Sequence, residues 1–180
     1  NSVLIGGGMA YTFLKAQGKG IGGSKLEKDR IDYAKGLLDK IRKIGLNLAL
    51  PVDNVVVDKI DNASNIKIVG EEIPEGLIGV DIGPKTVDNF KSALKNSKTI
   101  LWNGPLGIFE IEKFSRGTSE IANFIANLNA TKIIGGGDTS SAISSLGLET
   151  KMSHVSTGGG ASLEFLEGKN LPGIACLRDK

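Results

Sequence analysis

Short runs of apolar residues alternate along the chain with longer segments in which apolar residues recur every three or four positions. The clearest helical pattern covers residues 26–44, and Gly45 follows it where a helix stop belongs. Its apolar face would be formed by Ile31, Ala34, Leu38 and Ile41. Similar patterns predict helices at residues 9–16, 84–94, 118–127, 138–146 and 162–166. Apolar, β-rich runs predict strands at residues 2–5, 47–50, 55–57, 99–102, 131–134 and 153–156.

The alternation of strands and helices predicts the fold class. Short strands rich in Val, Ile and Leu, each followed by a helix, are typical of an α/β protein with a parallel sheet and helices on both faces, a three-layer α/β/α arrangement. Ligands of such sheets bind beyond the carboxyl ends of the strands. Residues 62–78 give mixed signals, and both an edge hairpin and an irregular excursion fit them. No linker divides the chain, so we expect one domain.

Glycine is unusually frequent and unusually placed. The chain has 25 glycines in 180 residues, about twice the average share. Nine of them form three triplets, which are residues 6–8, 135–137 and 158–160. Each triplet falls between a predicted strand and a predicted helix. The backbone must therefore bend tightly, or be approached closely, at three places along one rim of the sheet.

Charge and composition exclude several classes of protein. The chain has 22 Lys and Arg against 20 Asp and Glu, a net charge of +2, and its lysines are scattered among acids along helix-like segments. This distribution predicts no nucleic-acid partner. No apolar run approaches the roughly 20 residues of a membrane span, and no signal-peptide pattern is present. The single cysteine, Cys176, excludes an internal disulfide and favours a cytoplasmic location.

Residues 133–140 place a strand, three glycines and a helix start in succession. The free N–H groups of a helix start attract anions, and glycine lets a phosphate reach them without meeting a side chain. Asp138 would cap this helix, and a carboxylate beside phosphates makes chemical sense if a divalent metal lies between them. Thr139 adds a hydroxyl next to it. The alternative is that Asp138 is simply an N-cap, and the pattern alone leaves both interpretations open.

Residues 154–162 repeat the same layout of strand, glycines and helix start. Two such turns on one rim would direct two sets of amide donors into a shared space. A transferring phosphoryl group needs such an environment, because its catalysis consists mostly of positioning and charge stabilisation. His154, the only histidine, lies within the predicted strand, so we expect it to be a buried core residue and not a catalytic one.

A third motif covers residues 100–110, where a strand ends in Trp-Asn-Gly-Pro and continues as an apolar loop. Leu106, Ile108 and Phe109 would form the apolar wall of a purine pocket. Glu110 would accept hydrogen bonds from ribose hydroxyls. The alternative is a packed turn followed by a glutamate that starts a helix.

One glycine-rich segment does not indicate a nucleotide site. Residues 18–23 match the spacing G-x-G-x-x-G, but they follow a helical segment and not a strand, so the dinucleotide-binding interpretation fails. The chain contains no Walker A sequence. The first triplet also lacks the glycine spacing of a dehydrogenase fingerprint.

Taken together, six motifs resemble the nucleotide-binding, C-terminal half of the phosphoglycerate kinase family. They occur in order and cover nearly the whole chain. The motifs are residues 5–13, 50–53, 79–84, 102–110, 135–139 and 154–164. The resemblance implies a Rossmann-like domain that binds Mg²⁺ with ADP or ATP. It further implies a second, N-terminal domain that binds 3-phosphoglycerate or 1,3-bisphosphoglycerate, and a monomeric enzyme with no membrane or nucleic-acid partner.

The resemblance also assigns roles to individual residues. Residues at the base and ribose would be Gly7, Gly79, Asn103, Gly104, Leu106, Phe109 and Glu110. Thr139 would contact the phosphates, and Asp138 would hold the metal. Backbone amides at the transferring phosphoryl group would come from Gly136, Gly137, Gly159 and Gly160.

Two departures from the family qualify these expectations. The family has a Gly-Gly-Ala-Lys segment just upstream of the first triplet, which residues 1–180 do not include, and we expect the domain's first strand and helix and the whole N-terminal domain to be missing from them as well. We therefore expect residues 1–180 to be inactive alone. The sequence leaves two hypotheses open: these residues are part of an active kinase, or they form a nucleotide-binding module that catalyses nothing. Lys25 also stands where many relatives have an apolar residue, although its stem would still cover the base.

Overall fold

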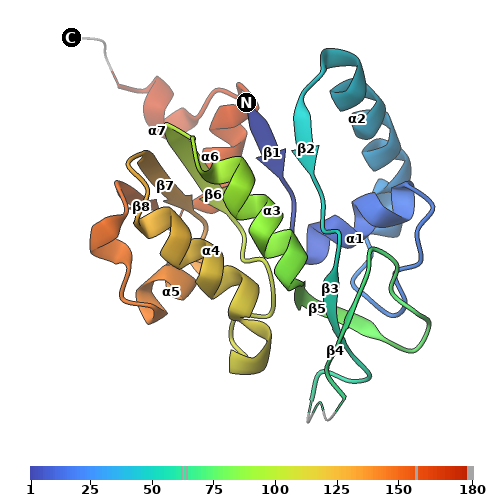
Figure 1. The fold of residues 1–180 in the computed structure, drawn as a ribbon. Helices are drawn as coiled ribbons and strands as arrows, with labels where there is room; N and C mark the ends of the chain where they lie inside the picture. The colour runs from blue at the N-terminus through green and yellow to red at the C-terminus, as the bar shows by residue number, and fades with distance from the viewer. Residues whose placement is uncertain (62, 64, 157, 178–180) are drawn as a thin grey trace.

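The computed structural model describes residues 1–61, 63, 65–156 and 158–177 (Figure 1). Its strands are β1 (Ser2–Leu4), β2 (Asn47–Ala49), β3 (Asn54–Val57), β4 (Lys67–Val69), β5 (Ile78–Ile82), β6 (Thr99–Asn103), β7 (Thr131–Gly135) and β8 (His154–Ser156). Its α-helices are α1 (Gly7–Ala16), α2 (Ile31–Ile44), α3 (Pro84–Leu94), α4 (Arg116–Ala126), α5 (Gly137–Ser145), α6 (Gly159–Leu166) and α7 (Pro172–Ala175). Short 3-10 helices are η1 (Lys28–Arg30), η2 (Glu112–Phe114) and η3 (Glu149–Lys151).

The predicted parallel strands are present. Strand β6 pairs with β7 and β7 with β8, all parallel, and β1 pairs in parallel with β2. Helices α3 and α4 lie side by side along the β6–β8 sheet, while α1 and α2 gather beside β1 and β2 (Figure 1). The α/β class with a parallel sheet and helices is therefore confirmed.

A third sheet, antiparallel and in the order β4-β3-β5, was not predicted. Of the two interpretations of residues 62–78, the edge hairpin is closer to the structure, because β4 lies at the sheet edge and pairs antiparallel with β3; residues 62 and 64 lie outside the described part. The apolar pattern did not predict β5, because Gly79 and Asp81 interrupt its apolar run and both residue types are depleted in strands. Gly79 packs against Tyr11, and Asp81 accepts a hydrogen bond from the Gly117 N–H, which explains both residues.

Helix boundaries differ from the predictions mainly at the amino ends. Helix α2 begins at Ile31, after the 3-10 turn η1, and not at residue 26. It ends as expected, with Gly45 in the left-handed conformation (φ 66°) that favours glycine. Helices α5 and α6 begin earlier than predicted, inside their glycine triplets. The glycines therefore belong to the helix starts themselves.

The main core lies between the β6–β8 sheet and the helices that cover it. Its buried side chains include Phe90, Trp102, Ile125, Ile134 and Ile143. His154 is exposed, so the prediction of a buried histidine was wrong. The physical reason is that β8 is the edge strand of its sheet and His154 is its first residue. No helix among the described residues has the length and apolarity that crossing a membrane requires.

Replacing Gly36 by Ala should stabilise the fold. Gly36 is exposed in the interior of α2, and a Cβ at this position would meet nothing within 4 Å. Alanine restricts the unfolded chain and favours the helix, so we expect a gain of about 0.5–1 kcal/mol in the free energy of unfolding. Urea unfolding followed by circular dichroism measures this, and an unchanged or lower midpoint would contradict it.

Candidate functional site

A pocket with a volume of about 890 Å³ lies at the carboxyl ends of β1 and β6. It contains residues from five of the six sequence motifs. The predicted site residues that line it are Gly7, Gly79, Asn103, Gly104, Leu106, Glu110 and Asp138. Segments that are far apart in the sequence therefore meet at one rim of the molecule, as the strand order predicts.

The second and third glycine triplets form two turns in direct contact. Gly136 is the N-cap of α5, with φ 93°, and its N–H donates to the Ser156 carbonyl at 3.0 Å. Gly159 is buried at the start of α6, and a Cβ added to it would lie 2.6 Å from the Gly136 Cα. Only glycine permits this approach. Gly137 and Gly160 are the exposed neighbours in the same two helix starts.

Asn103 joins the end of β6 to both turns. Its Nδ2 donates to the Gly159 carbonyl at 3.3 Å. Its Oδ1 would lie 3.1 Å from a Cβ on Gly136. The Asn103 side chain therefore bonds to the Gly159 turn and lies beside the Gly136 turn at the edge of the pocket.

Asp138 lies in the first turn of α5, is exposed, and lines the pocket. The predicted cap was wrong, because the N-cap is Gly136 and Asp138 makes no capping hydrogen bond. Within the described part of the chain its carboxylate has no hydrogen bond or ion pair with another residue. No group of three or more acidic, His or Cys side chains that could hold a metal occurs there either. Asp138 is thus a single, available oxygen ligand beside a pocket.

Thr139 is fully buried, and its hydroxyl accepts the Gly104 N–H at 2.7 Å. This bond fixes the turn after β6 to the start of α5. The Thr139 side chain lies behind the pocket and is not part of its lining.

The apolar wall of the pocket differs from the predicted one by one residue. Leu106 is 8% exposed and lines the pocket together with Ile108, whereas Phe109 is half-buried and lies outside the lining. Glu110 is exposed at the rim, as a partner for solvated hydroxyl groups would be.

The first glycine triplet closes the other side of the pocket. Gly7 has φ 61°, and a Cβ on it would lie 2.6 Å from the Pro105 carbonyl oxygen, so α1 starts directly against the turn after β6. A Cβ on Gly79 would meet the Tyr11 hydroxyl, which explains the glycine inside β5. Burial, and to a lesser extent the nearby Asp81, raises the pKa of Tyr11, so its hydroxyl stays neutral.

Sequence reasoning missed Tyr11, Glu27 and Asp81 at this site. Tyr11 and Glu27 line the pocket from the segment that follows the first triplet. Tyr11 lies within the 5–13 motif and Glu27 in none, and neither was given a role, because only the fold brings both side chains to the rim. Asp81 carried a signal, since a charged residue inside an apolar stretch requires a specific partner.

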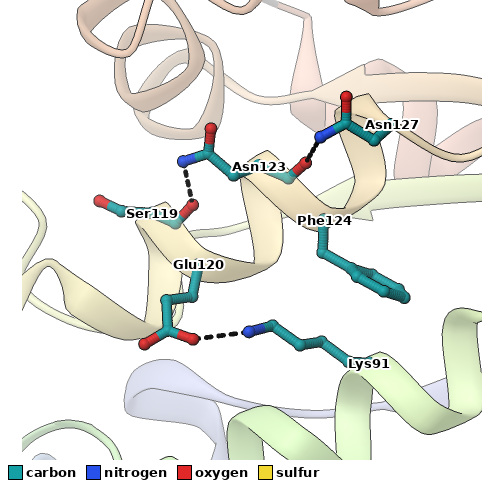
Figure 2. A pocket seen from close by; sticks show the side chains of 6 residues that line it. All are labelled: Lys91, Ser119, Glu120, Asn123, Phe124 and Asn127. Carbon is teal, nitrogen blue, oxygen red and sulfur yellow. Dashed lines mark hydrogen bonds and ion pairs between the residues drawn. The ribbon is translucent and has the colours of Figure 1, made fainter.

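A second, shallower groove runs along α3 and α4 (Figure 2). Lys91 Nζ lies 2.6 Å from Glu120 Oε2, while Asn123 and Asn127 donate to backbone carbonyls one turn earlier. The polar side chains of this groove thus already bond to each other or to backbone carbonyls. The groove offers no free charged group that resembles Asp138, so the 890 Å³ pocket is the candidate site.

Comparisons with known proteins agree on one family. The family model for phosphoglycerate kinase matches residues 1–169. The phosphoglycerate kinase of Clostridium botulinum (strain Langeland) is 54% identical over 181 residues, which cover 100% of this chain and 46% of that protein. The solved phosphoglycerate kinase of Coxiella burnetii superimposes with a TM-score of 0.91 at 42% identity, over 97% of this chain and 45% of that one.

The phosphoglycerate kinase of Pyrococcus horikoshii OT3 superimposes with a TM-score of 0.82 at 30% identity, over 97% of this chain and 44% of that one. This chain spans about half the length of the curated relatives it matches. The match of the family model over most of the chain, together with these relatives, shows that this chain belongs to the phosphoglycerate kinase family.

Proposed function

We propose that this chain is the nucleotide-binding, C-terminal half of a phosphoglycerate kinase and that its pocket binds ADP or ATP with Mg²⁺. The observation that carries the proposal is the contact between the Gly136 and Gly159 turns beside the free carboxylate of Asp138. Two helix starts in contact beside one pocket favour a polyphosphate there, because the N–H groups and dipoles of helix starts attract anions.

The base of the nucleotide would lie between the start of α1 and the turn after β6. Leu106 and Ile108 provide apolar contacts there, and Gly7 and Gly79 line the same pocket. The stem of Lys25 runs along Gly8, with its Cδ 3.1 Å from where a Cβ would be. The stem would cover the base while the ammonium stays in water. Glu110, at the rim, is the proposed acceptor for the ribose hydroxyls.

The phosphates would lie toward α5 and α6, where the exposed Gly137 and Gly160 present their backbone. Asp138 is the proposed metal ligand. One free carboxylate fits Mg²⁺, which proteins usually bind through one or two carboxylates together with substrate phosphates and water. When bound, Mg²⁺ would neutralise part of the phosphate charge. The residues themselves would orient the phosphates and exclude water from them.

The proposed reaction of the whole enzyme is reversible phosphoryl transfer between 1,3-bisphosphoglycerate and ADP, giving 3-phosphoglycerate and ATP. The acceptor would bind to the other half of the enzyme. The four glycines of the two turns would supply amides to the phosphoryl group as it moves, since such transfer depends mainly on positioning and charge stabilisation. The alternative is an isolated module that binds nucleotide and catalyses nothing.

We predict that residues 1–180 bind Mg-ADP but show no turnover. Among the described residues that line the pocket, Lys25 is the only basic one, which leaves most of the phosphate charge without a protein cation. Calorimetry with ADP, with and without Mg²⁺, tests the binding, and a coupled assay with 1,3-bisphosphoglycerate tests the turnover. Failure to bind Mg-ADP would refute the proposed function. Turnover at the rate of a complete kinase would refute the predicted inactivity.

A further inference from the structure

Asp81 is a buried carboxylate on β5 that no proposed role above uses. It is 1% exposed. Its Oδ2 accepts the Gly117 N–H at 2.7 Å, and its Oδ1 accepts the Ile82 N–H at 2.8 Å. Gly117 lies in the first turn of α4, where Ser115 makes no capping hydrogen bond. Asp81 therefore caps α4 from another element, and the positive end of the helix favours its charge.

The same carboxylate packs against the wall of the nucleotide pocket. A Cβ on Gly107 would clash with Asp81 Oδ1, and a Cβ on Gly117 would lie 2.5 Å from the same oxygen. Gly107 lines the pocket. Asp81 is thus enclosed between the pocket wall and the start of α4, and neither backbone can carry a side chain there.

Residues 106–108 form the part of the pocket wall next to Asp81, and hydrogen bonds hold them on both sides of Gly107. The Ile108 N–H donates to the Val80 carbonyl at 2.9 Å, next to Asp81 on β5. The Leu106 N–H donates to Thr118 Oγ1 at 3.0 Å, next to Gly117 on α4. Residues 106–108 are therefore held to β5 and to α4, and Asp81 occupies the point between the two attachments.

The surroundings of Asp81 place its titration in the neutral range. Burial raises the pKa of Asp81 to about 7, although the hydrogen bonds from the Gly117 and Ile82 N–H groups lower it. From α4, Glu120 raises the pKa and Arg116 lowers it. Glu120 stays ionised, because its hydrogen bond to Lys91 of α3 (Figure 2) and its bond to Arg116 both lower its own pKa.

Two further ionisable groups surround this cluster. Tyr11 faces Asp81 from α1 with a raised pKa and is neutral. Asp88 of α3 contributes through its charge at Arg116. The carboxyl of Asp81 is therefore ionised above about pH 7 and increasingly protonated below it, while its neighbours keep their charge states.

We propose that Asp81 is a positioning residue for the nucleotide pocket: its ionised carboxylate holds the Gly107 wall against α4, and protonation loosens that wall and weakens nucleotide binding. An N–H donates more strongly to a carboxylate than to a neutral acid. The added proton would also need an acceptor in space that Gly107 and Gly117 already fill. The inference rests on the proposed function, since it concerns the same pocket.

The test compares the dissociation constant of Mg-ADP for the wild-type chain and Asp81→Asn between pH 6 and 8.5. Protonation of ADP affects both chains equally, so it cancels in the ratio of the two constants. We expect wild-type affinity to fall about fivefold relative to Asp81→Asn as pH falls across this range, the difference between a charged and a neutral acceptor. Parallel profiles would overturn the inference.

Asp53→Asn is the matched control. Asp53 is also buried and caps a helix, accepting the Lys85 and Thr86 N–H groups at the start of α3, but it does not line the pocket or contact its wall. The control should retain the wild-type pH profile; a flattened profile in Asp53→Asn would overturn the inference. If the wild-type chain does not bind Mg-ADP even at pH 8.5, the proposed function fails first.

A measurement on the wild-type chain keeps the inference testable if Asp81→Asn does not fold. The amide resonances of Gly107 and Gly117, followed by NMR without nucleotide, should titrate together with a midpoint near 7. Amides that do not change between pH 6 and 8.5 would show that Asp81 does not couple to the wall, and would overturn the inference.

Discussion

Asp138→Ala should weaken Mg-ADP binding by about tenfold or more while metal-free ADP binds as well as before, or slightly better. Asp138 is exposed at the pocket and makes no capping bond, so its removal should leave α5 intact. Without this carboxylate the metal loses its protein ligand. Metal-free ADP loses only a repulsive negative charge next to its phosphates. Calorimetry at matched ADP concentrations, with and without Mg²⁺, measures both effects.

Asp32→Ala is the control for this prediction. Asp32 occupies the same place in the first turn of α2 and is also exposed, but it does not line the pocket. Its ion pair with Lys35 is a surface pair, which contributes little stability. Mg-ADP affinity should be unchanged in this variant. Equal losses with and without Mg²⁺ in Asp138→Ala would remove the proposed metal role.

Gly159→Ala should cost both stability and nucleotide affinity. The added Cβ would lie 2.6 Å from the Gly136 Cα and 2.9 Å from its nitrogen. Both atoms are backbone, so the two turns must move apart and the Asn103 bond to Gly159 must lengthen. We expect a loss of about 1–3 kcal/mol in the free energy of unfolding, the usual cost of overpacking. Thermal unfolding without nucleotide measures the loss of stability. The smaller stabilisation on adding Mg-ADP measures the loss of affinity.

Gly173→Ala provides the comparison for that variant. A Cβ at Gly173, in α7, would meet nothing within 4 Å, so stability and Mg-ADP affinity should both stay close to the wild-type values. If Gly159→Ala behaves like Gly173→Ala, the two glycine turns do not form the close contact on which the phosphate site depends.

Much of the fold follows from local physics. The strands that end in glycine triplets are short apolar runs, and the helices that follow start where glycine allows close backbone approach. Strand β5 could not be recognised this way, because Gly79 and Asp81 are unfavourable in isolated strands. Their presence depends on Tyr11 and on Gly117, which contact them only in the folded chain.

Residue type and spacing predict some features of the candidate site, whereas others depend on turn geometry and strand order. The glycine turns and the pocket-lining position of Asp138 follow from residue type and spacing. By contrast, which neighbouring apolar residue faces the pocket, Leu106 or Phe109, depends on the turn at Gly104, whose φ is 99°. The exposure of His154 depends on strand order, which a strand pattern alone does not reveal.

Amide chemical shifts recorded while Mg-ADP is added to the chain test the central claim most directly. We predict that the largest changes occur at Gly137, Asp138 and Gly160, with smaller ones along residues 104–108. Changes centred instead on Lys91, Ser119 and Asn123, in the groove between α3 and α4, would show that the nucleotide binds elsewhere and would contradict the account.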